Sequence, residues 1–227
     1  MADVTADAGG SAPVRVLIVD DDALVRAGLT MILSGAGDVD VVGEAADGSE
    51  VPAAVVRHRP DVVLMDIRMP RVDGLAATEA LRARPDAPEV IVLTTFDADE
   101  FVLRALRAGA SGFLLKDTPP VEILHAVRRV AAGEAMLSPT VTRQLIAHVA
   151  APAQSPRPTA VRQLSRLSER EREVALALGQ GKSNAEISAE LFMSVATVKA
   201  HVSRLLTKLE LNNRVQVALL VHDAGWA

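Results

Sequence analysis

Short apolar runs alternate with segments of helical spacing along the first 133 residues of the chain. Each run is too short for a helix and stops at polar or turn residues, as buried strands do. The expected strands cover residues 14–19, 39–45, 62–65, 90–93 and 112–115, and the expected helices cover residues 23–35, 49–57, 74–84, 100–108 and 121–132. Five alternations of strand and helix predict an α/β fold: a doubly wound parallel sheet of five strands with helices on both faces.

The end of the chain has only helical spacing and is predicted to form a four-helix, all-α domain. Ser168 is expected to begin its first helix as the N-cap, because Glu171 stands three places on and completes a capping box. The other helices are expected to begin at Ser183, near Val195 and near Arg214. Two helices joined by a tight turn, the second of them rich in basic residues, are typical of a helix-turn-helix.

Between these two patterns lies a stretch that favours a linker. Residues 151–159 are Pro-rich and lack apolar periodicity, although an ordered surface loop is an open alternative, and residues 139–149 favour a further short helix. We therefore expect four regions: a disordered N-terminus (1–12), an α/β domain (13–134), a linker (135–163) and an all-α domain (164–227).

Composition and charge exclude several classes of protein. The chain has no cysteine, so a disulfide framework, a thiolate metal site and a thiol nucleophile are excluded. No apolar run approaches the length of a membrane span, and residues 1–12 lack the apolar core of a secretory signal, so we expect a cytoplasmic protein. Residues 1–160 carry 15 Lys/Arg against 22 Asp/Glu, whereas residues 161–227 carry 9 against 7, which makes nucleic acid a candidate partner of the second domain.

Polar side chains with complementary chemistry follow four of the expected strands. They are Asp20 and Asp21, Asp66, Thr94 and Lys116. Parallel sheets bind ligands at the carboxyl ends of their strands, so these groups are expected to meet. Clustered carboxylates favour a hard cation such as Mg²⁺, and an aspartate can act as a nucleophile that forms an aspartyl phosphate. In the alternative interpretation, the aspartates after the first strand only cap a helix, Thr94 is a turn residue and Lys116 is a solvated charge. This interpretation is reasonable for each residue alone, but it requires that all of them have no functional role at the same time.

These residues stand in motifs that resemble the receiver domain of two-component response regulators. The motifs are Asp20-Asp21, Asp66-Ile67-Arg68-Met69-Pro70 with Asp73-Gly74, Leu93-Thr94-Thr95-Phe96, and residues 109–116 ending in Lys116. The resemblance covers about residues 14–133 and implies a flavodoxin-like strand order. It implies that Asp66 is the phosphoacceptor and that Lys116 pairs with the phosphate.

The same resemblance implies a metal site and a switch. Asp21, Asp66 and the backbone carbonyl of Arg68 would bind Mg²⁺, and Asp20 would assist. Thr94 and Phe113 would form the switch pair, in which the hydroxyl moves to the phosphate and the ring turns inward behind it. Asp22 falls one place after the family's acidic pair, so we expect it to be peripheral.

The helix expected from residue 195 carries basic and small residues on one face. They are Thr197, Lys199, Ala200, His201, Ser203, Arg204 and Lys208. Such residues meet phosphates and base edges in DNA, although a solvated basic face on an ordinary helical domain is the alternative. Three segments (residues 167–174, 181–188 and 197–202) resemble the LuxR-type helix-turn-helix. The resemblance implies a recognition helix with Lys199, Ala200 and Ser203 nearest the bases and with Thr197, His201 and Lys208 near the DNA backbone. It also implies a last helix that supplies the dimer contact on DNA.

Together the two resemblances predict a regulator of transcription similar to the NarL/FixJ response regulators. Its expected partners are a sensor histidine kinase that phosphorylates Asp66, double-stranded promoter DNA and, when phosphorylated or bound to DNA, a second copy of the chain; RNA polymerase is a further candidate. We expect no enzyme activity beyond self-phosphorylation and slow self-dephosphorylation at Asp66. Two alternatives stay open: a phosphatase with an aspartyl-phosphate intermediate, and a DNA-binding regulator with a vestigial receiver.

Overall fold

The computed structural model describes residues 12–84, 86–95, 99–137 and 158–226. The expected disorder of the N-terminus, the short helix at 139–149 and most of the linker fall on residues outside these ranges. No helix in the described part of the chain combines the length and the apolar character needed to cross a bilayer.

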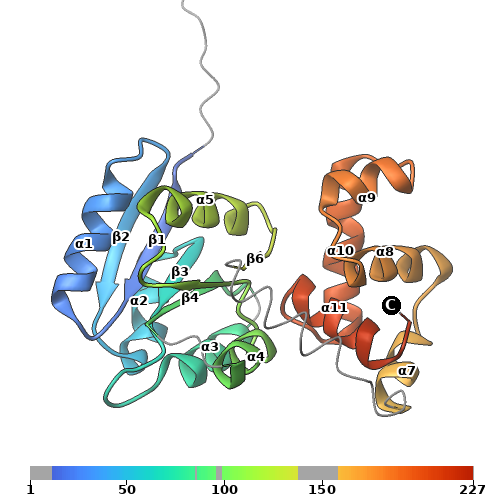
Figure 1. Cartoon of the computed structure of the whole chain (residues 1–227), viewed down its shortest axis with the longest axis horizontal. Helices are drawn as coiled ribbons and strands as arrows, with labels where there is room; N and C mark the ends of the chain where they lie inside the picture. The colour runs from blue at the N-terminus through green and yellow to red at the C-terminus, as the bar shows by residue number, and fades with distance from the viewer. Residues whose placement is uncertain (1–11, 85, 96–98, 138–157, 227) are drawn as a thin grey trace, which may run out of the picture.

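A parallel sheet forms the centre of the first domain (Figure 1). Its strands are β1 (Val14–Val19), β2 (Val39–Ala45), β3 (Val62–Met65), β4 (Glu89–Thr94), β5 (Gly112–Leu115) and β6 (Met136–Leu137). They lie in the order β2-β1-β3-β4-β5-β6, so the chain reverses its winding direction at β1 and β3. β3 is buried along its whole length, as its unbroken apolar run predicts.

The prediction of five strands was wrong by one, because the described sheet has six. β6 pairs with β5, and the backbone N–H of Met136 donates to the carbonyl of Ser111 at 3.1 Å. A two-residue strand has no room for the alternation or the apolar run that marks a strand in the sequence. Only its edge position beside β5 makes it a strand.

Helices cover both faces of the sheet, as predicted (Figure 1). α1 (Ala23–Ser34) and α5 (Pro120–Ala131) pack on one face, with Leu29, Leu33 and Val127 in the core beneath them. α2 (Val51–His58), α3 (Gly74–Arg82) and α4 (Asp99–Arg107) cover the other face, and the short 3-10 helix η1 (Gly48–Glu50) precedes α2. All the loops after β1, β3, β4 and β5 therefore reach the same edge of the sheet.

The second domain contains α7 (Pro158–Leu164), α8 (Glu169–Gly179), α9 (Asn184–Glu190), α10 (Val195–Leu209) and α11 (Arg214–Asp223). The last four of these helices lie where the sequence predicts them. α7 begins within the stretch expected to be a linker (135–163) and ends at the first residue of the expected all-α domain. Its Ala160, like Leu164, is buried in the core of the second domain, so the helix belongs to that domain. That core is formed by residues from all five helices, among them Val174, Ile187 and Val198.

The predicted capping box at Ser168 and Glu171 is present, and it has a partner that local sequence does not reveal. Lys208 of α10 places its Nζ atom 2.6 Å from the Glu171 carboxylate. The hydrogen bond from Lys208, followed by the one from the Ser168 backbone, lowers the pKa of Glu171 from its ordinary 4.5 to about 2. The ionised carboxylate therefore stabilises the folded domain.

This pKa gives a pH-dependent prediction. A lowered folded-state pKa adds stability that is present above about pH 4.5 and is lost as the pH falls toward 2. Glu171→Gln is expected to lower the free energy of unfolding by about 1 kcal/mol at pH 7, with the difference shrinking below pH 4.5. Trp226, the single tryptophan, packs on this core and reports its unfolding by fluorescence. Glu173→Gln, in an exposed ion pair on the same helix, is the control; a Glu171→Gln difference that is independent of pH would contradict the prediction.

Candidate phosphoacceptor site and nucleic-acid interface

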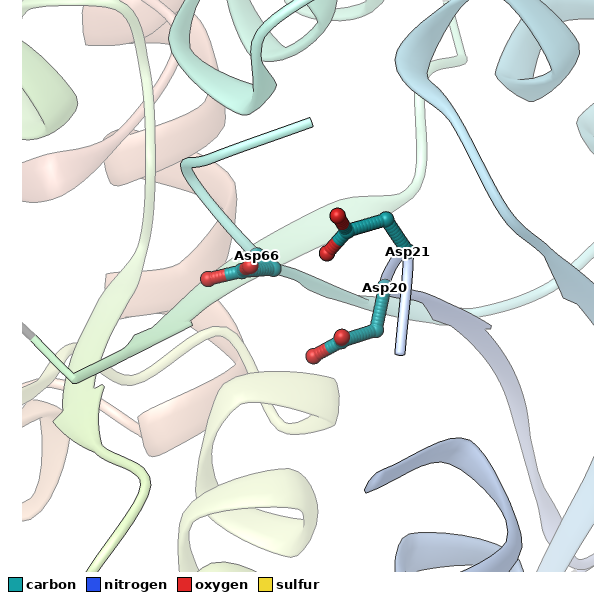
Figure 2. A group of neighbouring side chains, drawn as sticks. All are labelled: Asp20, Asp21 and Asp66. Atoms are coloured by element: carbon teal, nitrogen blue, oxygen red, sulfur yellow. The ribbon is translucent and has the colours of Figure 1, made fainter. Parts of the chain in front are cut away.

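Three aspartates meet at the carboxyl edge of the sheet, as the sequence predicts (Figure 2). One carboxylate oxygen from each of Asp20, Asp21 and Asp66 lies within 4.8 Å of the others. Asp20 and Asp66 are buried, with 2% and 6% of their surface exposed, whereas Asp21 is exposed. The group is therefore a concentration of negative charge that is open to solvent on the side of Asp21.

Backbone hydrogen bonds of the sheet fix the positions of these aspartates. The N–H of Asp66 donates to the carbonyl of Val19 at 2.8 Å, and the N–H of Asp20 donates to the carbonyl of Ala45 at 3.1 Å. On α1, Arg26 donates from its guanidinium to the backbone carbonyl of Asp20 at 2.7 Å. This role of Arg26 could not be predicted, because nothing in its spacing along the sequence separates it from an ordinary exposed arginine of a helix.

Lys116 enters the same cluster from the end of β5. Its Nζ atom lies 2.6 Å from Oδ2 of Asp20 and 3.2 Å from Oδ2 of Asp66. Burial lowers the pKa of Lys116, but hydrogen bonds and charges from Asp20 and Asp66 outweigh burial, so its pKa is raised and it stays charged. The pKa of Asp66 is raised, mainly because the carboxyl group is buried. The charge of Lys116 lowers this pKa, whereas the nearby negative charge of Asp20 raises it further. A second cation at the cluster would favour the ionised form of Asp66.

Asp22 is peripheral to the cluster, as expected. Its side chain accepts a hydrogen bond from the N–H of Leu24 at 2.8 Å and caps α1. Of the three acidic residues after β1, Asp22 is therefore the one that caps α1. Asp20 instead turns toward Lys116.

The predicted switch residues lie on the next two strands. Thr94 ends β4 with 1% of its surface exposed, and its carbonyl accepts a hydrogen bond from the N–H of Lys116 at 2.8 Å. Phe113 lies on β5 opposite Val92 and is fully buried. Its apolar cluster includes Val102 and Leu106 of α4, so a change at Phe113 reaches that helix.

Gly74 begins α3 directly against Asp66, the predicted phosphoacceptor. A Cβ atom at Gly74 would lie 1.9 Å from the carbonyl oxygen of Asp66. Gly74→Ala is therefore expected to displace Asp66, to destabilise the protein by about 1–3 kcal/mol and to impair phosphorylation of the folded fraction. Thermal unfolding followed by circular dichroism tests this, with Gly28→Ala as the control, because a Cβ there meets nothing within 4 Å. Equal stability of the two variants would contradict the prediction.

α10 presents most of its predicted DNA-contacting residues on its surface. Thr197, Lys199, Ala200, Ser203 and Arg204 are exposed. Ser194 caps the helix, and its hydroxyl lies 2.8 Å from the hydroxyl of Thr197.

The other two residues predicted to contact DNA, His201 and Lys208, interact with or are partly covered by the rest of the second domain. Lys208 is exposed but pairs with Glu171, and His201 is half-buried, with its Nδ1 atom buried and without a hydrogen-bond partner among the described residues. Among the described residues, Lys199 and Arg204 form no ion pair within the second domain and carry the positive charge of the exposed face, whereas Lys208 shares its charge with Glu171.

The two domains contact each other through α11. Val215 is buried in the same apolar cluster as Phe113 and Leu106 of the first domain, and Leu219 packs against that cluster. The amide of Asn213 donates to the carbonyl of Ala110 at 2.7 Å.

Two further hydrogen bonds extend this contact. The amide of Gln216 donates to the carbonyl of Arg107 at 2.7 Å, and the guanidinium of Arg82 donates to the carbonyl of Asn212. None of these contacts could be predicted from the sequence, because they join residues more than 100 positions apart.

The face of α10 that is predicted to contact DNA borders the first domain. Lys199 and Ser203 line a cleft whose other wall includes Glu89, Ser111 and Glu134. Glu89 and Glu134 each pair with an arginine of the first domain, Arg82 at 3.4 Å and Arg129 at 2.8 Å, so the described residues of this wall carry no unpaired acidic charge. Lys199 and Ser203, which are expected to lie near DNA bases, thus face the first domain across this cleft.

Comparison with known proteins identifies the families of the two domains. Residues 16–128 match the response regulator receiver domain, and residues 165–221 match the bacterial regulatory proteins of the luxR family. LiaR, a transcriptional regulatory protein of Bacillus subtilis, is 37% identical over 92% of this chain and 97% of its own. The nitrate/nitrite response regulator NarL of Escherichia coli K12 is 36% identical over 93% and 96%.

A solved structure of similar length shows the same likeness. The crystal structure of ChrA, a response regulator of a haem-sensing two-component system, covers 96% of this chain and 100% of its own, at 36% identity and a TM-score of 0.52. The family is one of phosphorylation-dependent regulators of transcription rather than of conventional enzymes. The chain belongs to the NarL/LiaR-type response regulators, which join a receiver domain to a LuxR-type helix-turn-helix domain.

Proposed function

We propose that a sensor histidine kinase phosphorylates Asp66 and that this separates α11 and α10 from the receiver, which frees them for dimerisation and DNA binding. The observation that carries this proposal is the shared apolar cluster of Phe113 and Val215. It connects the strand next to Thr94 directly with α11. A change of packing at Phe113 would thus alter the surface that holds the second domain.

The chemistry at Asp66 follows from the residues around it. An oxygen of the Asp66 carboxylate attacks phosphorus, a P–O bond forms, the P–N bond of the phosphohistidine breaks, and its electron pair remains on the imidazole nitrogen, which takes up a proton. Lys116, already 3.2 Å from Asp66, is placed to pair with the phosphoryl oxygens. The hydroxyl of Thr94 would donate a hydrogen bond to the same group and so register its presence.

The donor set fits a magnesium ion. Asp20, Asp21 and Asp66 offer carboxylate oxygens within 4.8 Å of one another, and the backbone carbonyl of Arg68 would complete the protein's share of the ligands. When bound, Mg²⁺ neutralises charge on the transferring phosphoryl group. Asp21, the exposed member of the group, would face the entering ion, and Lys116 would compensate the buried charge of Asp20.

The second domain would bind promoter DNA as a dimer. The last helix, α11, is our candidate for the contact between two copies, and its residues Val215 and Leu219 now pack on the receiver. Dimerisation through this face requires that the receiver leave it. Two copies would then place their α10 helices in half-sites about one helical turn apart, or a multiple of it. With DNA and the kinase as partners, we infer a cytoplasmic location. We also propose two domains whose bounds differ from the expected 13–134 and 164–227: the first extends through β6, and the second begins with α7.

Lys199 is expected to read a base. Lys199→Ala should weaken binding by about 1–3 kcal/mol at one operator position and relax the preference there. Lys208→Ala is the comparison: as a backbone contact it should weaken all sequences alike and lower the salt dependence. Affinities measured over a set of single-base operator variants decide between these patterns. A uniform loss for Lys199→Ala would make it a phosphate contact instead.

Selection of genomic DNA fragments tests the proposed function as a whole. The full-length protein is incubated with a fragment library, with and without Mg²⁺ and beryllofluoride, a mimic of the phosphoryl group. Enrichment of fragments with paired half-sites only when the mimic is present is the expected result. The same enrichment without the mimic would contradict phosphorylation control of DNA binding, and no enrichment in either condition would contradict the role of α10.

A further inference from the structure

Asp47 is a buried carboxylate that lies outside the aspartate cluster but holds the loop that follows the phosphoacceptor. Its surface is 1% exposed. Oδ2 accepts a hydrogen bond from the backbone N–H of Arg71 at 2.9 Å. Oδ1 accepts from the N–H of Ser49 at 2.9 Å and from its hydroxyl at 2.6 Å. One side chain thus joins the start of η1 to the loop between β3 and α3, 24 residues away.

The neighbouring residues strengthen this connection. The N–H of Gly48 donates to the carbonyl of Val72 at 3.2 Å, and a Cβ atom at Gly48 would lie only 2.5 Å from that carbonyl oxygen. The guanidinium of Arg71 lies 3.4 Å from Asp47 and 2.8 Å from Glu50. The loop is therefore held against η1 at two successive residues, Arg71 and Val72.

Asp47 is charged in this position. The hydrogen bond from the Ser49 hydroxyl holds its pKa well below the usual range, burial opposes this, and the backbone N–H groups of Ser49 and Arg71 add to the lowering. Hydrogen bonds to an ionised acceptor are stronger than those between neutral groups, so the attachment of the loop is firm.

The same loop is fixed at its far end. The N–H of Gly74 donates to the carbonyl of Ile67 at 2.8 Å, and Asp73 caps α3 through the N–H of Ala76 at 2.7 Å. Arg68, whose carbonyl is the proposed magnesium ligand, lies within this closed loop. A backbone carbonyl cannot adjust by rotating a side chain, so its position depends on what holds the loop.

We propose that Asp47 is a positioning residue of the phosphoacceptor site: it fixes the loop after β3 so that the Arg68 carbonyl is presented to Mg²⁺. This proposal rests on the proposed function. Mg²⁺ demands nearly ideal octahedral geometry, so a displaced carbonyl weakens its binding. Loss of a residue that orients a metal ligand lowers metal affinity by about 10- to 100-fold. A loosened loop is expected to weaken Mg²⁺ binding without unfolding the receiver.

The test is a titration of ¹⁵N-labelled full-length protein with MgCl₂, followed by amide chemical shifts. Asp47→Ala is expected to raise the Mg²⁺ dissociation constant by about tenfold or more. Gly48→Ala displaces the same loop by another route and should weaken Mg²⁺ binding in the same direction. Asp47→Asn keeps one oxygen for the N–H of Arg71 and should restore most of the affinity.

Ser49→Ala is the matched control. It removes a hydrogen bond from the same carboxylate but leaves the bond to Arg71 in place, so its Mg²⁺ affinity should equal that of the wild type. A merely structural role of Asp47 predicts that affinity follows stability, with Ser49→Ala affected in proportion to its loss of stability.

Two outcomes would overturn the proposal. One is an unchanged dissociation constant in both Asp47→Ala and Gly48→Ala, and the other is a failure of Asp47→Asn to recover affinity. Failure of the proposed function is seen separately, in the wild type: a wild-type protein that binds no Mg²⁺ and takes no phosphoryl group from acetyl phosphate would contradict that function. Normal wild-type behaviour with unaffected variants contradicts the role of Asp47 alone.

Discussion

Asp66→Asn is expected to abolish phosphorylation of the protein by a small-molecule phosphodonor in the presence of Mg²⁺. An amide has no anionic oxygen to attack phosphorus, and the change also removes one of the three carboxylates proposed to hold the metal. The substitution is nearly isosteric and relieves repulsion with Asp20, so the fold should be retained. Intact-protein mass spectrometry measures the loss: the wild type gains the mass of one phosphoryl group, and the variant gains none.

Asp73→Asn is the matched control for Asp66→Asn. Asp73 lies in the same loop, and its side chain caps α3 through a hydrogen bond that an asparagine oxygen also accepts. This variant should be phosphorylated like the wild type. Phosphorylation of Asp66→Asn at the wild-type level, or peptide mapping that locates the group at another residue, would contradict the assignment of Asp66.

Asn213→Asp combined with Gln216→Glu is expected to increase the affinity of the unphosphorylated protein for its operator. Each change removes an amide donor to a receiver carbonyl, at Ala110 and Arg107, yet keeps the oxygen that serves the second domain itself. Two such hydrogen bonds contribute about 1–3 kcal/mol together, and the new charge at the buried position 213 opposes closure further. Such a shift toward the open form raises affinity by about tenfold or more if the closed form dominates.

The two negative charges added by this double substitution separate the expected effect from a general electrostatic effect on DNA binding. Two added carboxylates by themselves weaken DNA binding, so a gain in affinity cannot come from electrostatics. The control adds the same charges away from the interface, as Gln163→Glu with Gln180→Glu. It should bind DNA no better than the wild type. If the interface variant binds as weakly as the control, contact between α11 and the receiver does not restrain DNA binding.

Most of the receiver could be predicted from local sequence. β3 is the clearest example, because a four-residue apolar run ending at Asp66 has few alternatives to a buried strand. The positions of Asp20 and Lys116 beside Asp66 could also be predicted, because parallel strands bring their carboxyl ends to the same edge of the sheet. β6 could not, because its two residues carry no periodicity and are a strand only through pairing with β5.

The contacts between the two domains could not be predicted from the sequence. Asn213 resembles any helix cap, and its second hydrogen bond exists only because α11 packs on the receiver. Lys208 was predicted as a DNA contact, which stays a prediction, while its ion pair with Glu171 emerged only from the structure. Asp47 did leave a signal that was overlooked, namely an acidic residue shortly after β2 at the same edge of the sheet as Asp20. Long-range contacts depend on three-dimensional packing, which local patterns do not encode.

The most direct test of the central claim is the operator affinity of the wild type and of Asn213→Asp/Gln216→Glu, each with and without Mg²⁺ and beryllofluoride. If phosphorylation acts by opening the contact of α11 with the receiver, the mimic should strengthen binding by the wild type about tenfold or more, and should have much less effect on the variant, whose contact is already open. An equal gain for both proteins would show that the phosphoryl group acts independently of this contact and would contradict the account.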